Sequence, residues 1–165
     1  MARDKKFRER KEKSEFDQKL MDLARVARVV KGGRRFRFRA TLVIGNRKGK
    51  VGVGVGKGSD VSDAIKKAFN DAKKNLVIVA LKGNTIRHDI FYKLGSAKVI
   101  LKPAVPGKGI IAGGAVRAVV DLAGIKDIVS KSLGSANKLS VARATIEALK
   151  ITRETRFRKN RLSDN

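Results

Sequence analysis

The chain has 165 residues and carries 40 Lys and Arg against 15 Asp and Glu, a formal net charge of +25 with a pI of about 11.1. It has no Cys and a single His, which excludes disulfides, thiol nucleophiles, and metal sites built from Cys or several His. A compact chain with this charge repels itself unless a polyanion neutralises it, so the composition indicates a nucleic-acid-binding protein.

Aromatic residues make up only 5% of the chain, and there is no Trp. A protein that stacks single-stranded bases on rings would need more, so we expect recognition of structured nucleic acid through phosphates and grooves. The N-terminal residues lack the apolar stretch of a secretory signal, and no segment reaches transmembrane length. These features predict a cytoplasmic protein without a membrane partner.

Both ends of the chain are rich in charge. Residues 1–20 alternate basic and acidic side chains with few apolar ones, which predicts a flexible arm. Residues 151–165 form a basic tail. We expect both segments to be disordered in the isolated protein, although folding on contact with RNA stays open.

The first module, residues 21–79, is predicted to fold as three strands and a helix. Residues 26–31 are rich in β-formers, and Gly32 and Gly33 then stand where a two-residue hairpin turn belongs. Residues 34–45 alternate strictly, which predicts a strand with an apolar face and an arginine-rich face. Residues 46–49 form a second turn.

The third strand alternates Val and Gly over residues 51–56, and a helix follows with its cap near Ser59 or Asp60. Glycine inside a strand has no side chain to pack, so another group is expected to approach that face closely. The sequence leaves two candidates for that group, a neighbouring element of the same chain and an RNA backbone.

The second module, residues 80–150, has a different pattern. Taken from about residue 76, the predicted order is β-β-β-α-β-α, with strands over 76–81, 85–92, 98–102 and 126–130. Gly113 and Gly114 open the first helix, and Gly124 closes it. The last helix begins near Asn137 or Ser140. The predicted fold class is therefore α+β, with charged tails at both ends.

The main candidate site is the stretch from Leu23 to Ser59, which contains no acidic residue. A solvated strand face normally mixes signs, and one sign sustained over this length attracts phosphate. Alternate arginines on a strand stand about 6.6 Å apart, close to the phosphate repeat of a nucleic-acid strand. A charged sheet face that only blocks edge aggregation is the alternative. The predicted RNA-binding residues are Arg25, Arg28, Lys31, Gly32, Gly33, Arg34, Arg35, Arg37, Arg39, Arg47, Lys48, Lys50 and Lys57.

Two glycine motifs suggest nucleotide binding. Residues 52–59 lack the spacing of a phosphate-binding P-loop. Residues 107–112 fit G-x-G-x-x-A between a strand and a helix, and Asp127 lies about twenty residues on. A kinase using this loop would need a magnesium-binding acid, for which Asp121 is the nearest candidate. We expect His88 to face RNA or core on a strand rather than to catalyse.

Four ordered segments resemble the bacterial ribosomal protein S5 family of the small subunit: residues 28–36, 50–57, 107–117 and 140–146. The resemblance implies a first domain like a double-stranded-RNA-binding module. It implies a second domain with a left-handed βαβ fold that some small-molecule kinases share. Because fold does not carry function, the kinase interpretation weakens.

The resemblance further implies a structural protein without enzymatic activity or cofactor. Such a protein binds 16S rRNA, bridges the head and body of the subunit, contacts ribosomal proteins S4 and S8, lies near the messenger RNA entry path and supports translational accuracy. Residues 30–36 resemble the loop that reaches toward the spectinomycin-binding region of the rRNA. The resemblance also implies a surface that faces S4 and affects fidelity, with Gly107, Lys108, Gly109 and Arg117. A free-standing RNA chaperone or double-stranded-RNA binder remains an alternative.

Overall fold

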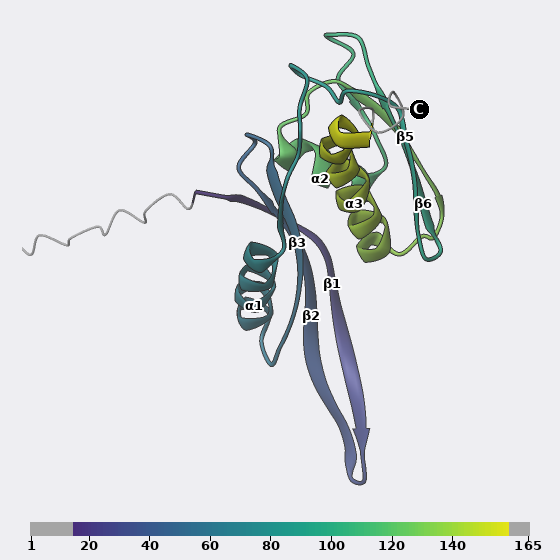
Figure 1. Ribbon diagram of the computed structural model, residues 1–165. Coiled ribbons are helices and arrows are strands. Elements are labelled where there is room, and N and C mark those ends of the chain that lie inside the picture. Colours follow the sequence, from purple (N-terminus) through teal and green to yellow (C-terminus); the bar gives the residue numbers. More distant parts are fainter. Residues whose placement is uncertain (1–14, 159–165) are drawn as a thin grey trace, which may run out of the picture.

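The computed structural model describes residues 15–158, which form two sheets and three helices (Figure 1). The first sheet is antiparallel with the order β1-β2-β3-β4, and helix α1 (Val61–Lys74) packs on it. Its strands are β1 Asp17–Val30, β2 Gly33–Gly45, β3 Lys50–Gly58 and β4 Leu76–Ile78. Beyond α1, β1 and β2 run on together as a long hairpin that projects from the rest of the molecule (Figure 1).

The second sheet has the order β5-β6-β8-β7, and β7 and β8 are parallel with helix α2 (Gly114–Ala123) between them in sequence. Helix α3 (Lys138–Arg158) follows β8 and packs on the same sheet. The strands are β5 Ile90–Leu94, β6 Ala97–Pro103, β7 Ile110–Ile111 and β8 Ile128–Gly134. The predicted α+β fold class is confirmed.

The glycine face of β3 packs directly on α1. A Cβ built on Gly54 would stand 2.2 Å from the carbonyl oxygen of Ala68, and one on Gly56 would stand 2.3 Å from that of Ala64. Both alanines are fully buried. Glycine on the strand and alanine on the helix therefore let the two backbones approach closely. Of the two candidates left by the sequence, the neighbouring helix is the group that lies against this face.

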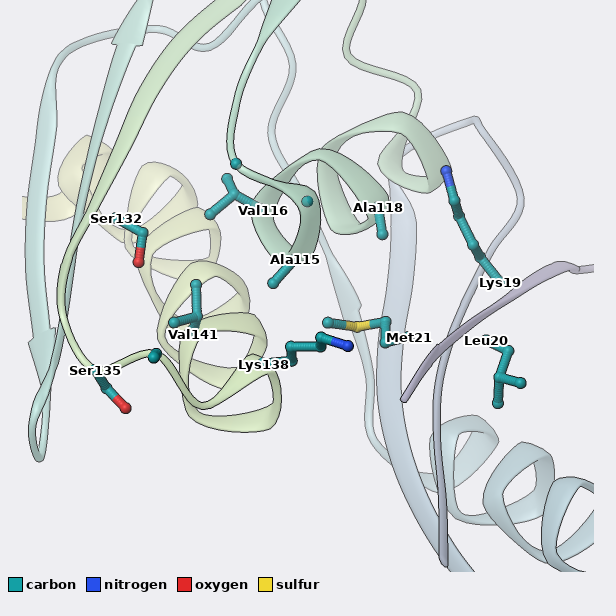
Figure 2. A pocket seen from close by; sticks show the side chains of 13 residues that line it. Lys19, Leu20, Met21, Ala115, Val116, Ala118, Ser132, Ser135, Lys138 and Val141 are labelled. Carbon is teal, nitrogen blue, oxygen red and sulfur yellow. The ribbon is translucent and has the colours of Figure 1, made fainter. Parts of the chain in front are cut away.

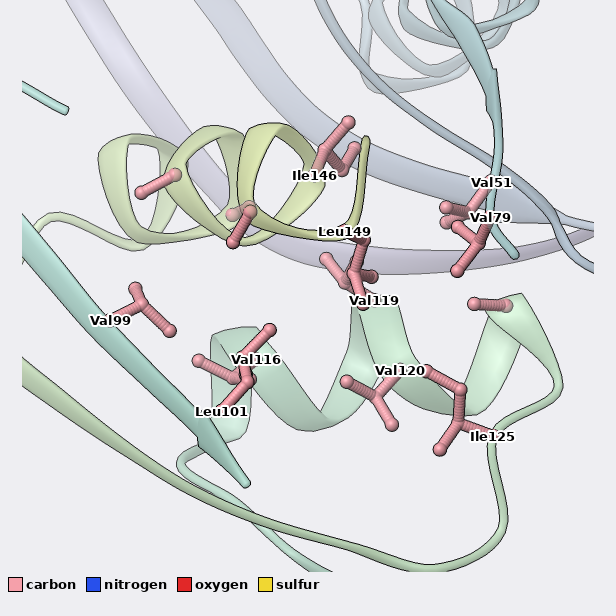
Figure 3. Packing of buried hydrophobic residues seen from close by; sticks show 14 of the residues in the cluster. Val51, Val79, Val99, Leu101, Val116, Val119, Val120, Ile125, Ile146 and Leu149 are labelled. Atoms are coloured by element: carbon pink, nitrogen blue, oxygen red, sulfur yellow. The ribbon is translucent and has the colours of Figure 1, made fainter. Parts of the chain in front are cut away.

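The first sheet is buried on both sides near its centre. Ala40, Leu42 and Ile44 form a small core with α1. Alternate residues, such as Val43, point the other way, into a larger core that contains residues of α2, α3 and the second sheet. Figure 3 shows Val51 beside Val79, and Leu149 beside Val119, in this core. Because each fully buried aliphatic side chain contributes about 1.5–3 kcal/mol, this shared core holds the two sheets together.

Several predicted boundaries differ from the structure. The first strand begins at Asp17, inside the expected arm, and residues 31–32 form the hairpin turn, one residue earlier than predicted. The strand expected over 76–81 is only Leu76–Ile78, and it joins the first sheet rather than the second. The strand expected over 85–92 is Ile90–Leu94, which leaves the half-buried His88 outside any strand.

Two further elements differ from the sequence-based expectation. Strand β7 has only two residues, too few for a periodic signal, and it lies where a loop is predicted. Helix α3 continues to Arg158, through half of the expected basic tail. The rest of the tail, and residues 1–14 of the expected arm, lie outside the described residues.

Candidate nucleic-acid interface

The hairpin register places four predicted arginines on one face. Residues directly opposite each other in an antiparallel ladder share a face, and here Arg28 lies opposite Arg35. Arg37 and Arg39 lie on the same side, opposite Val26 and Ala24. On the next strand Lys57 lies opposite Arg39. We call this set the basic face: Arg28, Arg35, Arg37, Arg39 and Lys57.

The basic face continues the same side of the sheet that enters the large core. Nearer the second sheet this side carries Val43, Val51 and Val53, all buried. Farther out the positions become arginine and lysine, and all are exposed except Arg39, which is half-buried. The Nε atom of Arg39 is buried without a hydrogen-bond partner among the described residues. Helix α1 packs on the opposite side of the sheet, so it leaves this face open.

The other side of the hairpin holds two more predicted residues, Arg25 and Arg34. The guanidinium of Arg25 lies over the ring of Phe36 at 3.6 Å from its centroid. This cation–π contact contributes about 0.5–1 kcal/mol at an exposed site, so it favours one orientation of Arg25. At the tip, Lys31, Gly32 and Gly33 are all exposed, and no neighbouring group fills the space beside either glycine.

The turn after β2 lies at the other end of that strand, about 40 Å from the tip at 3.3–3.4 Å per residue. Here Arg47 has a φ of +54° and donates its backbone amide to the carbonyl of Leu122, at 3.0 Å. Its Nε also pairs with Asp17 at 2.9 Å. Lys48 and Lys50 are exposed beside it, and both donate their backbone amides to Oδ1 of Asn46. The structure therefore separates Arg47, Lys48 and Lys50 from the basic face.

The loop before α2 is held by an acidic residue that directly precedes β8. Asp127 is 4% exposed, and its Oδ1 accepts a hydrogen bond of 2.9 Å from the amide of Gly109. The carbonyl of Gly109 in turn accepts from the amide of Ile128 at 3.1 Å. Gly107 and Gly109 have φ of +87° and +76°, a conformation that favours glycine. Asp127 thus fixes the conformation of the loop. In a dinucleotide-binding site, the acidic residue at this position would instead bind a ribose hydroxyl.

The other predicted residues of this region stand at the surface. Lys108 and Arg117 are exposed, the first in the loop and the second on α2. The kinase candidate Asp121 lies 3.9 Å from Lys19 of β1. Among the described side chains of residues 15–152, no three His, Asp or Glu residues gather as a metal site would require.

The contact between the two sheets was not predicted, although the residue pattern of β2 contains a signal for it. Outward positions 35, 37, 39 and 41 of β2 are polar, and the change to Val43 marks where the face turns inward. Asp22 of β1 and Lys138 of α3 add an ion pair of 3.0 Å across this contact.

Close by is a pocket of about 400 Å³ between β1, α2 and the start of α3, into which Met21 points (Figure 2).

Among the described residues, no helix is both long and apolar enough to cross a membrane.

Comparison with known proteins assigns the family. Residues 16–80 match the model "Ribosomal protein S5, N-terminal domain", and residues 92–160 match "Ribosomal protein S5, C-terminal domain". Proteins named "Small ribosomal subunit protein uS5" from the Campylobacter jejuni strains 81-176, 81116 and RM1221 are each 56% identical over 141 residues, which cover 86% of this chain and 96% of theirs.

These matches cover most of the chain and agree with the resemblance read from its four motifs. The family consists of structural components of the small ribosomal subunit in the bacterial cytoplasm, whose partners are rRNA and ribosomal proteins, and it is not a family of enzymes. This chain belongs to the ribosomal protein S5 family and is a structural constituent of the small ribosomal subunit.

Proposed function

We propose that the basic face of the hairpin binds 16S rRNA by gripping successive phosphates. The observation that carries this proposal is the register that puts Arg28, Arg35, Arg37, Arg39 and Lys57 on one open face without an acidic neighbour in the stretch from Leu23 to Ser59. Guanidinium groups bind phosphate oxygens bidentately, which an ammonium cannot do. Arg39 is half-buried, so its side chain has fewer orientations to lose when it binds a phosphate.

The remaining predicted RNA contacts extend from this face. Arg25 and Arg34 on the far side of the hairpin, with Lys31, Gly32 and Gly33 at its tip, would let the hairpin insert between RNA segments. A second RNA contact would be made by Arg47, Lys48 and Lys50, about 40 Å from the hairpin tip. A protein with two RNA contacts at this distance can bridge two parts of the subunit, and we assign these parts to the head and the body.

We further propose that the loop and helix surface of Gly107, Lys108, Gly109 and Arg117 faces ribosomal protein S4 and affects translational accuracy. The loop is exposed but fixed by Asp127, so it can present a defined shape to a protein. Contacts with ribosomal protein S8 and with messenger RNA near its entry path complete the proposal. We keep residues 21–79 and 80–150 as the two functional modules, the first for RNA and the second mainly for proteins.

The proposal is tested by cofractionation of tagged full-length chain with small subunits washed in low and high salt. The wild type should stay on the subunits in both washes. A variant with Arg35, Arg37 and Arg39 changed to Gln should dissociate in high salt, because phosphate contacts are the salt-sensitive part of binding. Loss of the wild type in the low-salt wash, or equal retention of both proteins in high salt, would contradict the proposal.

A further inference from the structure

The outer face of the second sheet is unpartnered among the described residues. Alternation along β6 turns Ala97, Val99 and Leu101 inward, where they are buried with α2 and α3 in the large core. The outward positions carry large apolar side chains that stay exposed: Phe91 on β5 is 63% exposed and Ile111 on β7 is 49% exposed. Burying such side chains is favourable, so a contiguous set of them indicates an interaction site.

Strand pairing makes these apolar side chains contiguous. Phe91 lies opposite Ile100 of β6, and Ile111 lies opposite Val129 of β8. Ile100 pairs with Lys131, so it is the diagonal neighbour of Val129, at about 7–8 Å. Phe91, Ile100, Val129 and Ile111 therefore form one apolar stripe that crosses all four strands obliquely.

Lysines flank the stripe on both sides. Lys98 and Lys131 are exposed along one side of it, and Lys102 is exposed on the other. Asp89 stands 3.9 Å from Lys102. Among the side chains that the structure describes, residues 15–152, no ion pair joins Lys98 or Lys131 to a carboxylate. The apolar stripe is thus flanked on one side by two lysines without a carboxylate partner and on the other by the Lys102–Asp89 pair.

We propose that this face docks an acidic amphipathic helix of a neighbouring protein in the small subunit. An oblique apolar stripe across strands matches the single apolar stripe of such a helix, and acidic residues beside that stripe would meet the lysines. The stripe is aliphatic except for Phe91, so it lacks the two or three rings on which sheet surfaces stack RNA bases. The inference goes beyond the proposed rRNA function, because it uses the second sheet and none of the basic face.

Site-specific photocrosslinking tests this inference. The full-length chain, with p-benzoylphenylalanine in place of Phe91, is assembled into small subunits, which are purified and irradiated, and mass spectrometry then identifies the attached peptide. The expected adduct is one segment of a ribosomal protein that is helical in pattern, apolar on one face and acidic beside it. Changing Lys98→Glu and Lys131→Glu together should lower its yield about tenfold or more, since like charges would then face each other.

A matched variant, Lys82→Glu with Lys126→Glu, makes the same charge change at exposed positions of the second half outside this face, and should keep the adduct. Thermal unfolding midpoints of both double variants should equal that of the unsubstituted chain. Adducts to nucleotides, no adduct at all, or a yield that both double variants leave unchanged would each overturn the inference. All of these variants keep the basic face intact, so rRNA binding measured in parallel tests the hairpin proposal separately.

Discussion

Arg28 lies directly opposite Arg35 in the β1–β2 ladder, so two guanidinium groups face the same side of a projecting hairpin. Like charges in directly opposed positions destabilise a strand pair. Neither residue forms an ion pair with a side chain of residues 15–152, the part whose side chains are described. In the free protein the two guanidinium groups therefore repel each other, whereas a phosphate bound between them would attract both.

The first prediction concerns this pair in the free protein. Arg28→Glu replaces a repulsive cross-strand pair with an attractive one and should stabilise the hairpin by about 0.5 kcal/mol. Because the hairpin projects from the core and can open locally, the measurement is amide hydrogen exchange over residues 26–37. Exchange should slow in the variant while its affinity for rRNA falls. Arg28→Gln, which only removes the repulsion, should show a smaller effect, and faster exchange in Arg28→Glu would refute this account of the pair.

The second prediction concerns the bond from Gly109 to Asp127. Asp127→Ala leaves the partly buried amide of Gly109 without its acceptor, which should cost about 1–3 kcal/mol in the free energy of unfolding. Asp127→Asn keeps an acceptor oxygen at the same place and should lose less. Urea unfolding of the three proteins measures both changes. Equal stability of the Ala variant and the wild type would show that the carboxylate does not hold the loop.

The third prediction concerns the contact between β3 and α1. Gly54→Ala puts a methyl group 2.2 Å from the carbonyl oxygen of Ala68, where only a shift of the backbone can make room. We expect a decrease of about 2 kcal/mol or more in unfolding free energy. Gly114→Ala is the matched control, because nothing lies within 4 Å of its Cβ and alanine favours a helix. A Gly54 variant as stable as this control would contradict the packing described for β3.

The fourth prediction concerns the contact between α2 and the turn that follows β2. Gly124 has a φ of +89°, and its Cβ would stand 2.1 Å from the carbonyl oxygen of Arg47. Gly95 also has a positive φ, +58°, but has open space around it. Gly95→Ala should therefore lower the free energy of unfolding only by the cost of the left-handed conformation for alanine, about 1–2 kcal/mol. Gly124→Ala should lower the thermal midpoint clearly more, and equal decreases would mean that this contact adds nothing.

The sequence predicted the elements whose pattern was strong. The alternation in residues 34–45 identified β2 and its arginine face, and the Val/Gly alternation identified β3 together with a close neighbour. It could not name that neighbour, because a bare glycine face accepts a helix or an RNA backbone equally well. Only the distance from Gly54 to Ala68 decides between them.

Other features were hidden for physical reasons. The start of β1 is polar, because Asp17 pairs with Arg47 and Lys19 pairs with Asp121 instead of entering a core. The sequence of this segment therefore resembled that of a charged arm. The role of Asp127 depends on a bond across 18 residues to the amide of Gly109, which no local pattern encodes. The pairing of Arg28 with Arg35, by contrast, follows from the position of the hairpin turn, although the predicted turn was one residue too late to give the register.

The salt dependence of rRNA binding tests the proposed phosphate contacts of the hairpin most directly. The full-length chain and the variant with Arg35, Arg37 and Arg39 changed to Gln are titrated with 16S rRNA at several salt concentrations. The slope of log affinity against log salt should become shallower by roughly one for each phosphate that the variant no longer neutralises, about two to three in all. A control that changes Lys66, Lys82 and Lys126 to Gln removes the same charge elsewhere and should keep the wild-type slope. Parallel slopes for the arginine variant and the wild type would contradict the account.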